Sequence, residues 1–123
     1  MLADPSVAAE PETAIATRLA RGEQIPGFGQ RLYPDGDPRA AVLLQCLRVP
    51  PRAQRVIDVM QPMTGLAPNI DYALLVLERA LRLPPGSAFA LFAVGRTVGW
   101  IAHALEQWRD GTLIRPRAVY RPA

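Results

Sequence analysis

Apolar side chains recur every three or four residues along most of the chain, which is the spacing of one face of an α-helix. Proline, glycine and capping residues interrupt this pattern and mark where helices begin and end. The pattern predicts helices over residues 12–21, 38–47, 51–60, 69–83 and 87–109. No convincing strand pattern precedes the tail, so we expect an all-α domain of about six helices.

Short motifs set the expected helix boundaries. Asp37 and Pro38 suit an N-cap followed by proline at the first helical position. Asn69 or Asp71 can cap the helix that follows them, and residues 61–68, with two prolines and one glycine, are expected to form a linker. The tail is expected to be extended because of its proline and β-branched residues.

The last predicted helix is apolar nearly all round, as expected of a helix buried between layers. Residues 88–105 are apolar enough to suggest a membrane span, but Arg96 and His103 interrupt them. A central arginine costs about 2.5–3.5 kcal/mol on membrane insertion. We therefore expect a buried helix of a soluble domain and no membrane partner.

Composition indicates one folded domain. The chain has 123 residues, of which 50% are hydrophobic and 20% charged, enough for a single core. All 14 basic residues are arginine, and 11 acidic residues leave a formal net charge of +3. Because the arginines are scattered rather than gathered in one stripe, nucleic acid is not an expected partner. Anionic small ligands fit better, since the arginine fork matches carboxylate and phosphate.

The chain offers few groups for metal binding or nucleophilic catalysis. Cys46 is the single cysteine, so no intramolecular disulfide is possible, and its apolar neighbours predict a buried structural thiol. His103 is the single histidine and lacks ligand partners, so we expect a structural role and no metal site. The N-terminus has no secretory signal pattern, which favours the cytoplasm, and residues 1–9 are expected to fray.

Three features could bind a ligand. Arg96 lies in an otherwise apolar helix, so its guanidinium needs an acid, a carbonyl or a bound anion. The internal acids that could pair with it are Asp58, Asp71, Glu78 and Glu106. The glycines of residues 27–29 permit a ligand to approach the backbone closely. Arg115 and Arg117 point the same way in an extended tail, where they form either an anion clamp or a solvated edge.

Four sequence blocks carry a family resemblance. They are residues 26–31 (PGFGQR), 37–39 (DPR), 69–71 (NID) and 95–103 (GRTVGWIAH), and 114–117 (IRPR) follow the last. In this order they resemble the C-terminal part of the citrate synthase family, which includes 2-methylcitrate synthases. The resemblance implies that residues 10–123 form a citrate-synthase-like small helical domain with a long C-terminal helix and an extended tail.

The resemblance also implies residue roles in an acyltransferase of the tricarboxylic acid cycle type, which condenses an acyl-CoA with oxaloacetate to form citrate or a methyl-citrate. Asp71 matches the aspartate that removes a proton from the acyl methyl group. Arg39 and Arg96 match arginines that hold carboxylates of oxaloacetate or citrate. Arg115 resembles an arginine lent to the neighbouring subunit's site. The loop Gly27-Phe28-Gly29 resembles the segment that lies against the coenzyme A adenine. No cofactor is expected to be bound permanently, because the coenzyme A thioester is a substrate.

The sequence departs from the family at Gln30, which stands where the family places its second catalytic histidine. A glutamine amide donates a hydrogen bond but transfers no proton at neutral pH. The family's first catalytic histidine and nearly all of its large domain would lie before residue 10. We therefore expect a truncated domain that is inactive alone.

Two hypotheses follow from the retained and the missing residues. In the first, the chain is a citrate-synthase-type domain that needs a complementing large domain or chain for catalysis. In the second, it is a non-catalytic carboxylate-binding or interaction module that assembles with a citrate synthase subunit. In both, the apolar final helix lacks its usual packing partner and leaves an exposed patch, so a homo-oligomer or a partner chain is expected.

Overall fold

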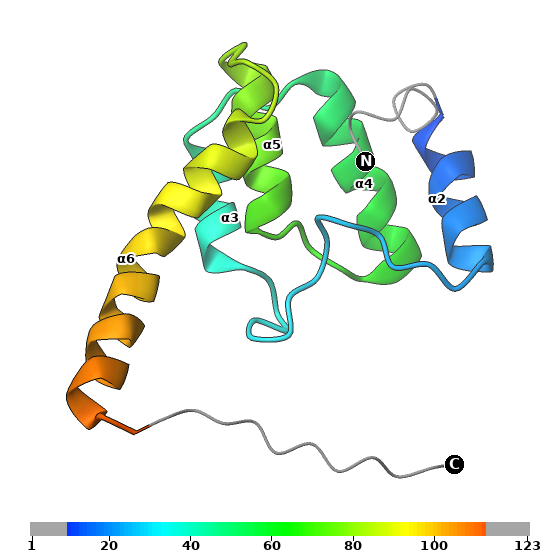
Figure 1. Ribbon diagram of the computed structural model, residues 1–123. Helices are drawn as coiled ribbons and strands as arrows, with labels where there is room; N and C mark the ends of the chain where they lie inside the picture. Colours follow the sequence, from blue (N-terminus) through cyan, green and yellow to red (C-terminus); the bar gives the residue numbers. More distant parts are fainter. Residues whose placement is uncertain (1–9, 113–123) are drawn as a thin grey trace, which may run out of the picture. The chain divides into compact units, whose positions relative to one another are not determined.

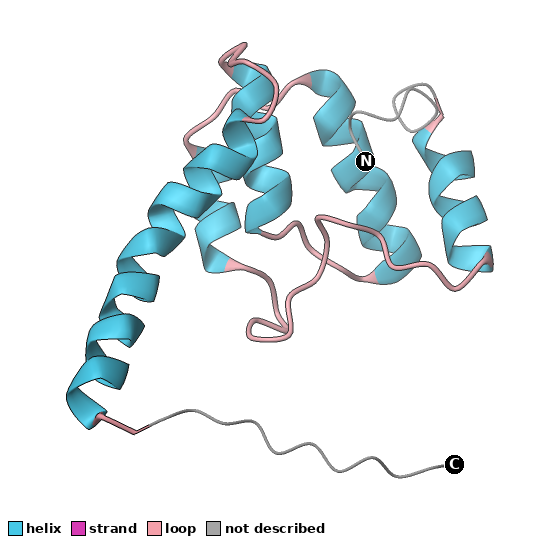
Figure 2. Cartoon of the chain, viewed as in Figure 1, coloured by secondary structure: helices cyan, strands magenta, loops and turns pink. Residues whose placement is uncertain are grey.

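The computed structural model describes residues 10–112 and shows an all-helical chain in that range, which confirms the expected fold class (Figures 1 and 2). The helices are α2 (Pro11–Ala20), α3 (Pro38–Gln45), α4 (Pro51–Thr64), α5 (Ile70–Ala80) and α6 (Ser87–Asp110). The predicted frayed N-terminus and extended tail lie outside the described residues.

Local capping explains where the central helices begin. The Asp37 carboxylate accepts a hydrogen bond from the Arg39 amide, and the Asn69 side chain accepts from the first amides of α5. Both predicted caps are confirmed, with Asn69 rather than Asp71 as the cap of α5. The predicted linker 61–68 is wrong in its first half, because α4 continues through Pro62 to Thr64 and ends at a left-handed Gly65.

Residues 10–92 belong to the first of two compact units and contain the core. Within this unit α3 packs against α5 and α2 packs against α4, as Figure 1 shows. The core cluster consists of Ile15, Ile25, Phe28, Ala53, Val56, Met60, Tyr72 and Val76. The largest of these, Tyr72, is fully buried and donates its hydroxyl to the Ala53 carbonyl at 2.8 Å. Burial raises the pKa of the Tyr72 hydroxyl, which keeps it neutral.

Cys46 is exposed, so the prediction of a buried thiol is wrong. The reason lies in the register of α3, whose buried residue is Ala40. Val42 is 62% exposed, and Cys46 follows it by four residues, which places the two on the same outward side of the helix end. Apolar neighbours in the sequence therefore did not mean burial of the thiol.

Residues 93–112 are the described part of the second unit, which continues α6 as a single helix. No residue of α6 is buried, so the expectation of a buried helix is wrong for the described chain. By length and composition α6 is also apolar enough to cross a membrane, a property that core helices of soluble proteins share. Its large apolar side chains Val94, Val98, Trp100, Ile101, Leu105 and Trp108 are exposed.

Candidate functional site

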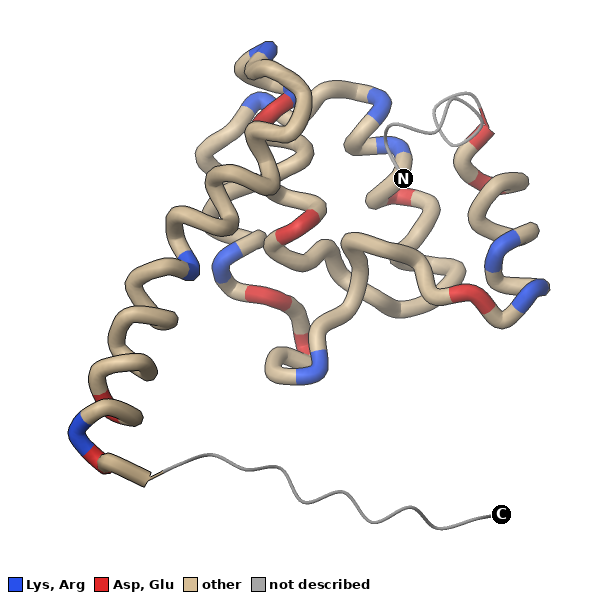
Figure 3. Tube along the Cα trace, viewed as in Figure 1, with Lys and Arg blue, Asp and Glu red and all other residues tan. Residues whose placement is uncertain are grey.

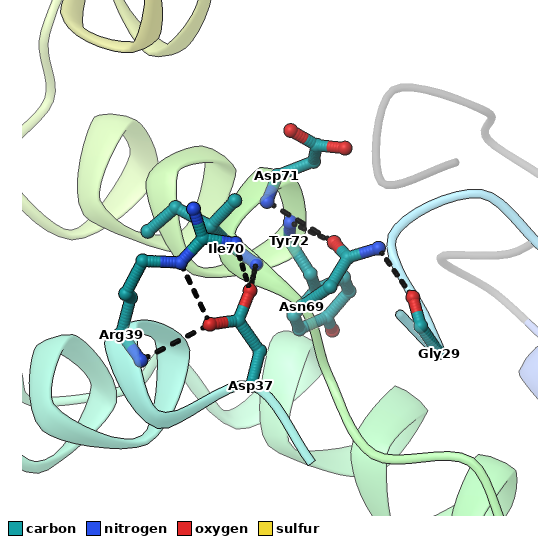
Figure 4. A network of polar contacts seen from close by, with 7 residues as sticks. All are labelled: Gly29, Asp37, Arg39, Asn69, Ile70, Asp71 and Tyr72. Atoms are coloured by element: carbon teal, nitrogen blue, oxygen red, sulfur yellow. Dashed lines mark hydrogen bonds and ion pairs between the residues drawn. The ribbon is translucent and has the colours of Figure 1, made fainter. Parts of the chain in front are cut away.

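The start of α5 is tied to the glycine-containing loop by Asn69. Its Oδ1 accepts hydrogen bonds from the amides of Asp71 at 3.1 Å and Tyr72 at 3.3 Å. Its Nδ2 donates to the Gly29 carbonyl at 3.0 Å, and its backbone amide donates to the Gly27 carbonyl at 2.9 Å. Figure 4 shows Asn69 between the loop and the helix. One side chain thus fixes the distance between the loop and Asp71.

Close packing requires glycine at position 27. Its φ is +89°, a conformation that L side chains rarely adopt, and an added Cβ would lie 3.1 Å from the Tyr72 Cβ. The neighbouring Phe28 is buried, and its ring centroid lies 4.8 Å from that of Tyr72. The loop therefore rests directly on α5, with Phe28 serving the core as well as the loop surface.

A cleft of about 720 Å³ opens beside this loop. It is lined by residues 25–31, together with Leu19, Glu23, Gln24, Leu66, Asn69 and Asp71. Of the residues predicted from sequence, the cleft brings together Gln30, Asp71 and the loop 27–29. Sequence reasoning missed Arg31 as a site residue, although its position beside Gln30 in the same block was the available signal.

Arg39 is held by a two-pronged ion pair with Asp37. Its Nε donates to the Asp37 Oδ1 at 2.9 Å and its Nη2 donates to Oδ2 at 2.8 Å. These hydrogen bonds hold the pKa of the Asp37 carboxyl below its ordinary value and raise the pKa of Arg39. The Arg39 side chain is half exposed and lies 5.4 Å from the centre of the Tyr33 ring. Because a guanidinium has five N–H donors, Arg39 keeps donors available for a ligand.

The Asp37 carboxylate also joins two helices. Besides capping α3, it accepts a hydrogen bond from the Ile70 amide at 3.0 Å, in the first turn of α5. The two residues are 33 positions apart in the sequence, so this contact could not be predicted from a local motif. Figure 4 shows Asp37 between Arg39 and the start of α5. The contact brings the Arg39 guanidinium to the same end of α5 as Asp71.

Asp71 is exposed, and its carboxylate accepts no hydrogen bond and forms no ion pair within residues 10–112. It points away from the pair of Asp37 and Arg39 (Figure 4). On its other side it borders an apolar cleft of about 450 Å³ that Leu74, Leu75, Ala88, Phe89 and Phe92 complete. A carboxylate so placed can accept a proton from a ligand in either cleft.

Arg96 belongs to the second unit, where its side chain is exposed and lies along its own helix beside Gly99. None of the acids considered for it forms an ion pair with it within residues 10–112. Arg115 lies outside the described residues. Of the predicted site residues, Asp71, Gln30 and the loop 27–29 thus line one cleft, whereas Arg39 lies at the same end of α5 but outside the lining of that cleft.

His103 is exposed and its Nδ1 lies 3.1 Å from the Glu106 Oε2 on the next turn of the same helix. This is a local surface contact. In the part of the chain that the structure describes, no group of three or more His, Cys, Asp or Glu side chains could hold a metal ion.

The comparisons with known proteins agree on one family. Residues 1–117 match the family described as citrate synthase, C-terminal domain. A citrate synthase of Haloferax volcanii is 35% identical over 121 residues, which cover 90% of this chain and 32% of the relative. Citrate synthase 2 of Bacillus subtilis is 34% identical, with 89% of this chain and 32% of the relative covered. A 2-methylcitrate synthase of Corynebacterium glutamicum is 33% identical, with 95% and 32% covered. The chain thus spans about a third of the length of these relatives.

Proposed function

Because this chain belongs to the citrate synthase family, we propose that it supplies part of a site where an acyl-CoA condenses with oxaloacetate. In the proposed reaction Asp71 takes a proton from the carbon next to the thioester carbonyl. The resulting enolate forms a carbon–carbon bond to the oxaloacetate carbonyl, and hydrolysis then releases coenzyme A and citrate or a methyl-citrate. The observation that carries this proposal is that Asp71 and the loop 27–29 line one cleft.

The geometry around Asp71 suits a general base. Its backbone amide donates to Asn69, which fixes the point at which the Asp71 side chain leaves the helix. The carboxylate makes no hydrogen bond to the described residues, which leaves its oxygens available to a substrate proton. General-base catalysis of this kind contributes about 10² to 10⁴-fold to a rate.

The loop and the arginines suit the two substrates. In the proposal the backbone of residues 27–29 lies against coenzyme A, and Arg31 in the same cleft pairs with one of its phosphates. Arg39 holds a carboxylate of oxaloacetate or citrate with the donors that Asp37 leaves available. Arg96 and Arg115 are proposed as further carboxylate ligands. Asp37 acts as a positioning residue, because its carboxylate accepts two hydrogen bonds from the Arg39 guanidinium and so holds it in one orientation.

Gln30 limits what these residues can do by themselves. It lines the cleft with Asp71 but cannot protonate the oxaloacetate carbonyl oxygen. We propose that the missing proton transfer and the rest of the site come from residues outside these 123, contributed by a complementing large domain or chain. A cytoplasmic protein and a homo-oligomer or mixed assembly are part of this proposal.

Gln30 also supports the second candidate, a non-catalytic module that binds a carboxylate or assembles with a citrate synthase subunit. The Arg39 fork binds an anion in either case, whereas proton transfer at position 30 matters only for catalysis. A substitution of Gln30 that restores proton transfer therefore distinguishes the two candidate functions.

Calorimetric titration of the purified chain with coenzyme A, oxaloacetate and citrate tests binding. We expect micromolar binding of a carboxylate that is lost in Arg39→Gln and weakened in Arg96→Ala. Arg109→Gln, an exposed arginine near the end of α6, is the control and should bind as the parent chain does. A folded chain that binds none of the three ligands would rule out a carboxylate site in the chain by itself and would leave only the role in assembly.

A complementation assay separates catalysis from binding alone. The chain is mixed with the N-terminal part of a citrate synthase, and condensation is followed by coenzyme A release. Gln30→His should raise the rate at least tenfold, and Asp71→Asn should abolish it while carboxylate binding persists. An unchanged zero rate in Gln30→His, with the assembly formed, would favour the non-catalytic module.

A further inference from the structure

A third cleft, of about 570 Å³, lies in the first unit and shares no residue with the candidate site. One wall is the segment 46–51, which joins α3 to α4, and the other is the segment 79–82 at the end of α5. Neither segment contains a residue assigned to the condensation reaction. Any ligand bound here would therefore be additional to the two substrates.

Three arginines line this cleft, and no acidic residue does. They are Arg48, Arg79 and Arg82, and all three are exposed. Figure 3 shows blue segments gathered around the chain turn that follows α5. Within residues 10–112 none of the three forms an ion pair. By contrast, Arg39 and Arg55 each contact a carboxylate within 4 Å. The cleft thus concentrates positive charge that the described chain does not neutralise.

The acid nearest in sequence is already engaged. Glu78 precedes Arg79, but it is only 6% exposed, and its carboxylate accepts a hydrogen bond from the Ala88 amide at 2.9 Å. It therefore serves the first turn of α6 rather than the arginines of the cleft. No carboxylate of the described residues therefore lies within ion-pair distance of the three guanidinium groups.

The backbone presents the arginines on fixed walls. Arg82 has a φ of +52°, the only positive value at a non-glycine residue within the described range. Glycine commonly occupies this position after a helix, so here a charged side chain replaces it. The Leu83 amide donates a hydrogen bond to the Glu78 carbonyl at 2.9 Å, and this bond ends the helix. On the opposite wall Pro50 and Pro51 restrict the chain, which lowers the entropy lost when a ligand binds.

We propose that this cleft binds a small anion that carries two or more phosphate groups. Arginine forks pair two N–H donors with two phosphate oxygens, and three forks around one cleft match several phosphate oxygens at once. The apolar residues Leu47, Val49, Pro50, Pro51 and Leu81 line the same walls. A nucleic acid fits less well, because its backbone needs a stripe of charge rather than one concave cluster.

The test uses inorganic pyrophosphate and the full chain. Calorimetry should show saturable binding of one pyrophosphate per chain, and amide resonances that shift in NMR spectra should belong to residues 46–49 and 79–83. Arg48→Gln, Arg79→Gln and Arg82→Gln should each weaken binding about tenfold or more. Arg79→Lys, which keeps the charge but loses the fork, should weaken it less than Arg79→Gln does. These side chains are exposed, so circular dichroism should show the parent fold in every variant.

Two matched controls separate a site from general positive charge. Arg52→Gln removes an exposed arginine just outside the cleft, and Arg109→Gln removes an exposed arginine near the end of α6. Both should bind pyrophosphate within twofold of the parent chain. No saturable binding at millimolar pyrophosphate, equal weakening by the controls, or shifts centred on residues 25–31 would overturn the proposal. So would equally tight binding of an RNA oligonucleotide.

Pyrophosphate is not a substrate of the proposed condensation, and none of the cleft arginines takes part in it. Failure of the phosphate site would therefore leave the proposed function untouched. Arg79 also lies in the last turn of α5, where a positive charge stabilises the helix. A change in stability alone would report that role, so the deciding result is the change in pyrophosphate affinity.

Discussion

The two units of this chain use helical sequence in different ways. Residues 10–92 bury apolar side chains from several helices around one core, and they join helix ends through Asp37 and Asn69. Residues 93–112 continue one helix whose apolar side chains stay exposed, among them Val98 at 73% and Trp108 at 80%. Helical stability in proteins comes mostly from packing an apolar face. The comparison teaches that an apolar helical pattern leads to buried side chains in the first unit and to exposed ones in the second.

Removal of the Asp37 carboxylate should give the largest effect. Asp37→Ala removes the cap of α3 and the acceptor of the Ile70 amide at the start of α5, so we expect a loss of about 3 kcal/mol in the free energy of unfolding. Urea denaturation followed by circular dichroism measures it. Asp35→Ala, an exposed aspartate two residues earlier, should change stability by less than about 0.5 kcal/mol. Equal losses of unfolding free energy in Asp37→Ala and Asp35→Ala would contradict the two stabilising contacts assigned to the Asp37 carboxylate.

A pair of identical truncations sharpens the comparison directly. Val56→Ala removes two buried methyl groups from the core of the first unit and should cost about 2 kcal/mol of unfolding free energy. Val98→Ala makes the same change in the second unit and should cost less than about 0.5 kcal/mol. Both can be measured by urea denaturation. A loss at Val98 that matches the loss at Val56 would mean that a second copy or another chain covers this helix in solution.

Two glycine substitutions test whether the loop really rests on α5. Gly27→Ala places a methyl group against Tyr72 in a left-handed backbone, and we expect a loss of about 2 kcal/mol. Gly22→Ala has the same backbone strain but no atom within 4 Å of the new Cβ, so about 1 kcal/mol is expected. Thermal unfolding with calorimetric enthalpies measures both. A smaller loss at Gly27 than at Gly22 would contradict the close packing.

The smallest expected effect is on the pH dependence of stability. The Arg39 hydrogen bonds lower the pKa of Asp37 in the folded chain below its ordinary value of 3.8. A group whose pKa is lowered on folding stabilises the protein above its unfolded pKa and loses that stabilisation as pH falls through the folded pKa. Unfolding free energy should therefore decline below about pH 4 more steeply in the parent chain than in Asp37→Asn. Parallel pH profiles would show that the ion pair adds no stability.

Sequence reasoning worked where the cause of a structure lies within a few residues. Asp37 and Asn69 were predictable as caps because each bonds to amides two or three positions further along. The pairing of Asp71 with the loop 27–29 came from the family resemblance, and the structure places both around one cleft. The bond from Asp37 to Ile70 was out of reach, because it depends on how α3 packs against α5.

Local signals also misled in three places. Pro62 indicated a break, but the helix tolerates the proline and ends only where Gly65 adopts a left-handed conformation. Cys46 has apolar neighbours and is nonetheless exposed at the end of α3. For α6 the apolar composition predicted burial, but no residue of the helix is buried. Burial requires a second element packed against the helix, and the residue pattern of one helix does not show whether such an element is present. In each case tertiary context decided the outcome.

The Asp37 carboxylate stabilises the starts of two helices, and this has a consequence for how mutations accumulate in this chain. Selection for folding alone would preserve Asp37, which stabilises the start of two helices, and would preserve Arg39 with it, because loss of Arg39 leaves the buried Asp37 carboxylate without its ion-pair partner. The side chains of Asp71 and Gln30 have no such tie to the fold, since neither makes a hydrogen bond or an ion pair within residues 10–112. Substitutions at these two positions should therefore accumulate in any lineage that gives up catalysis, while the ion pair of Asp37 and Arg39 persists as a by-product of stability.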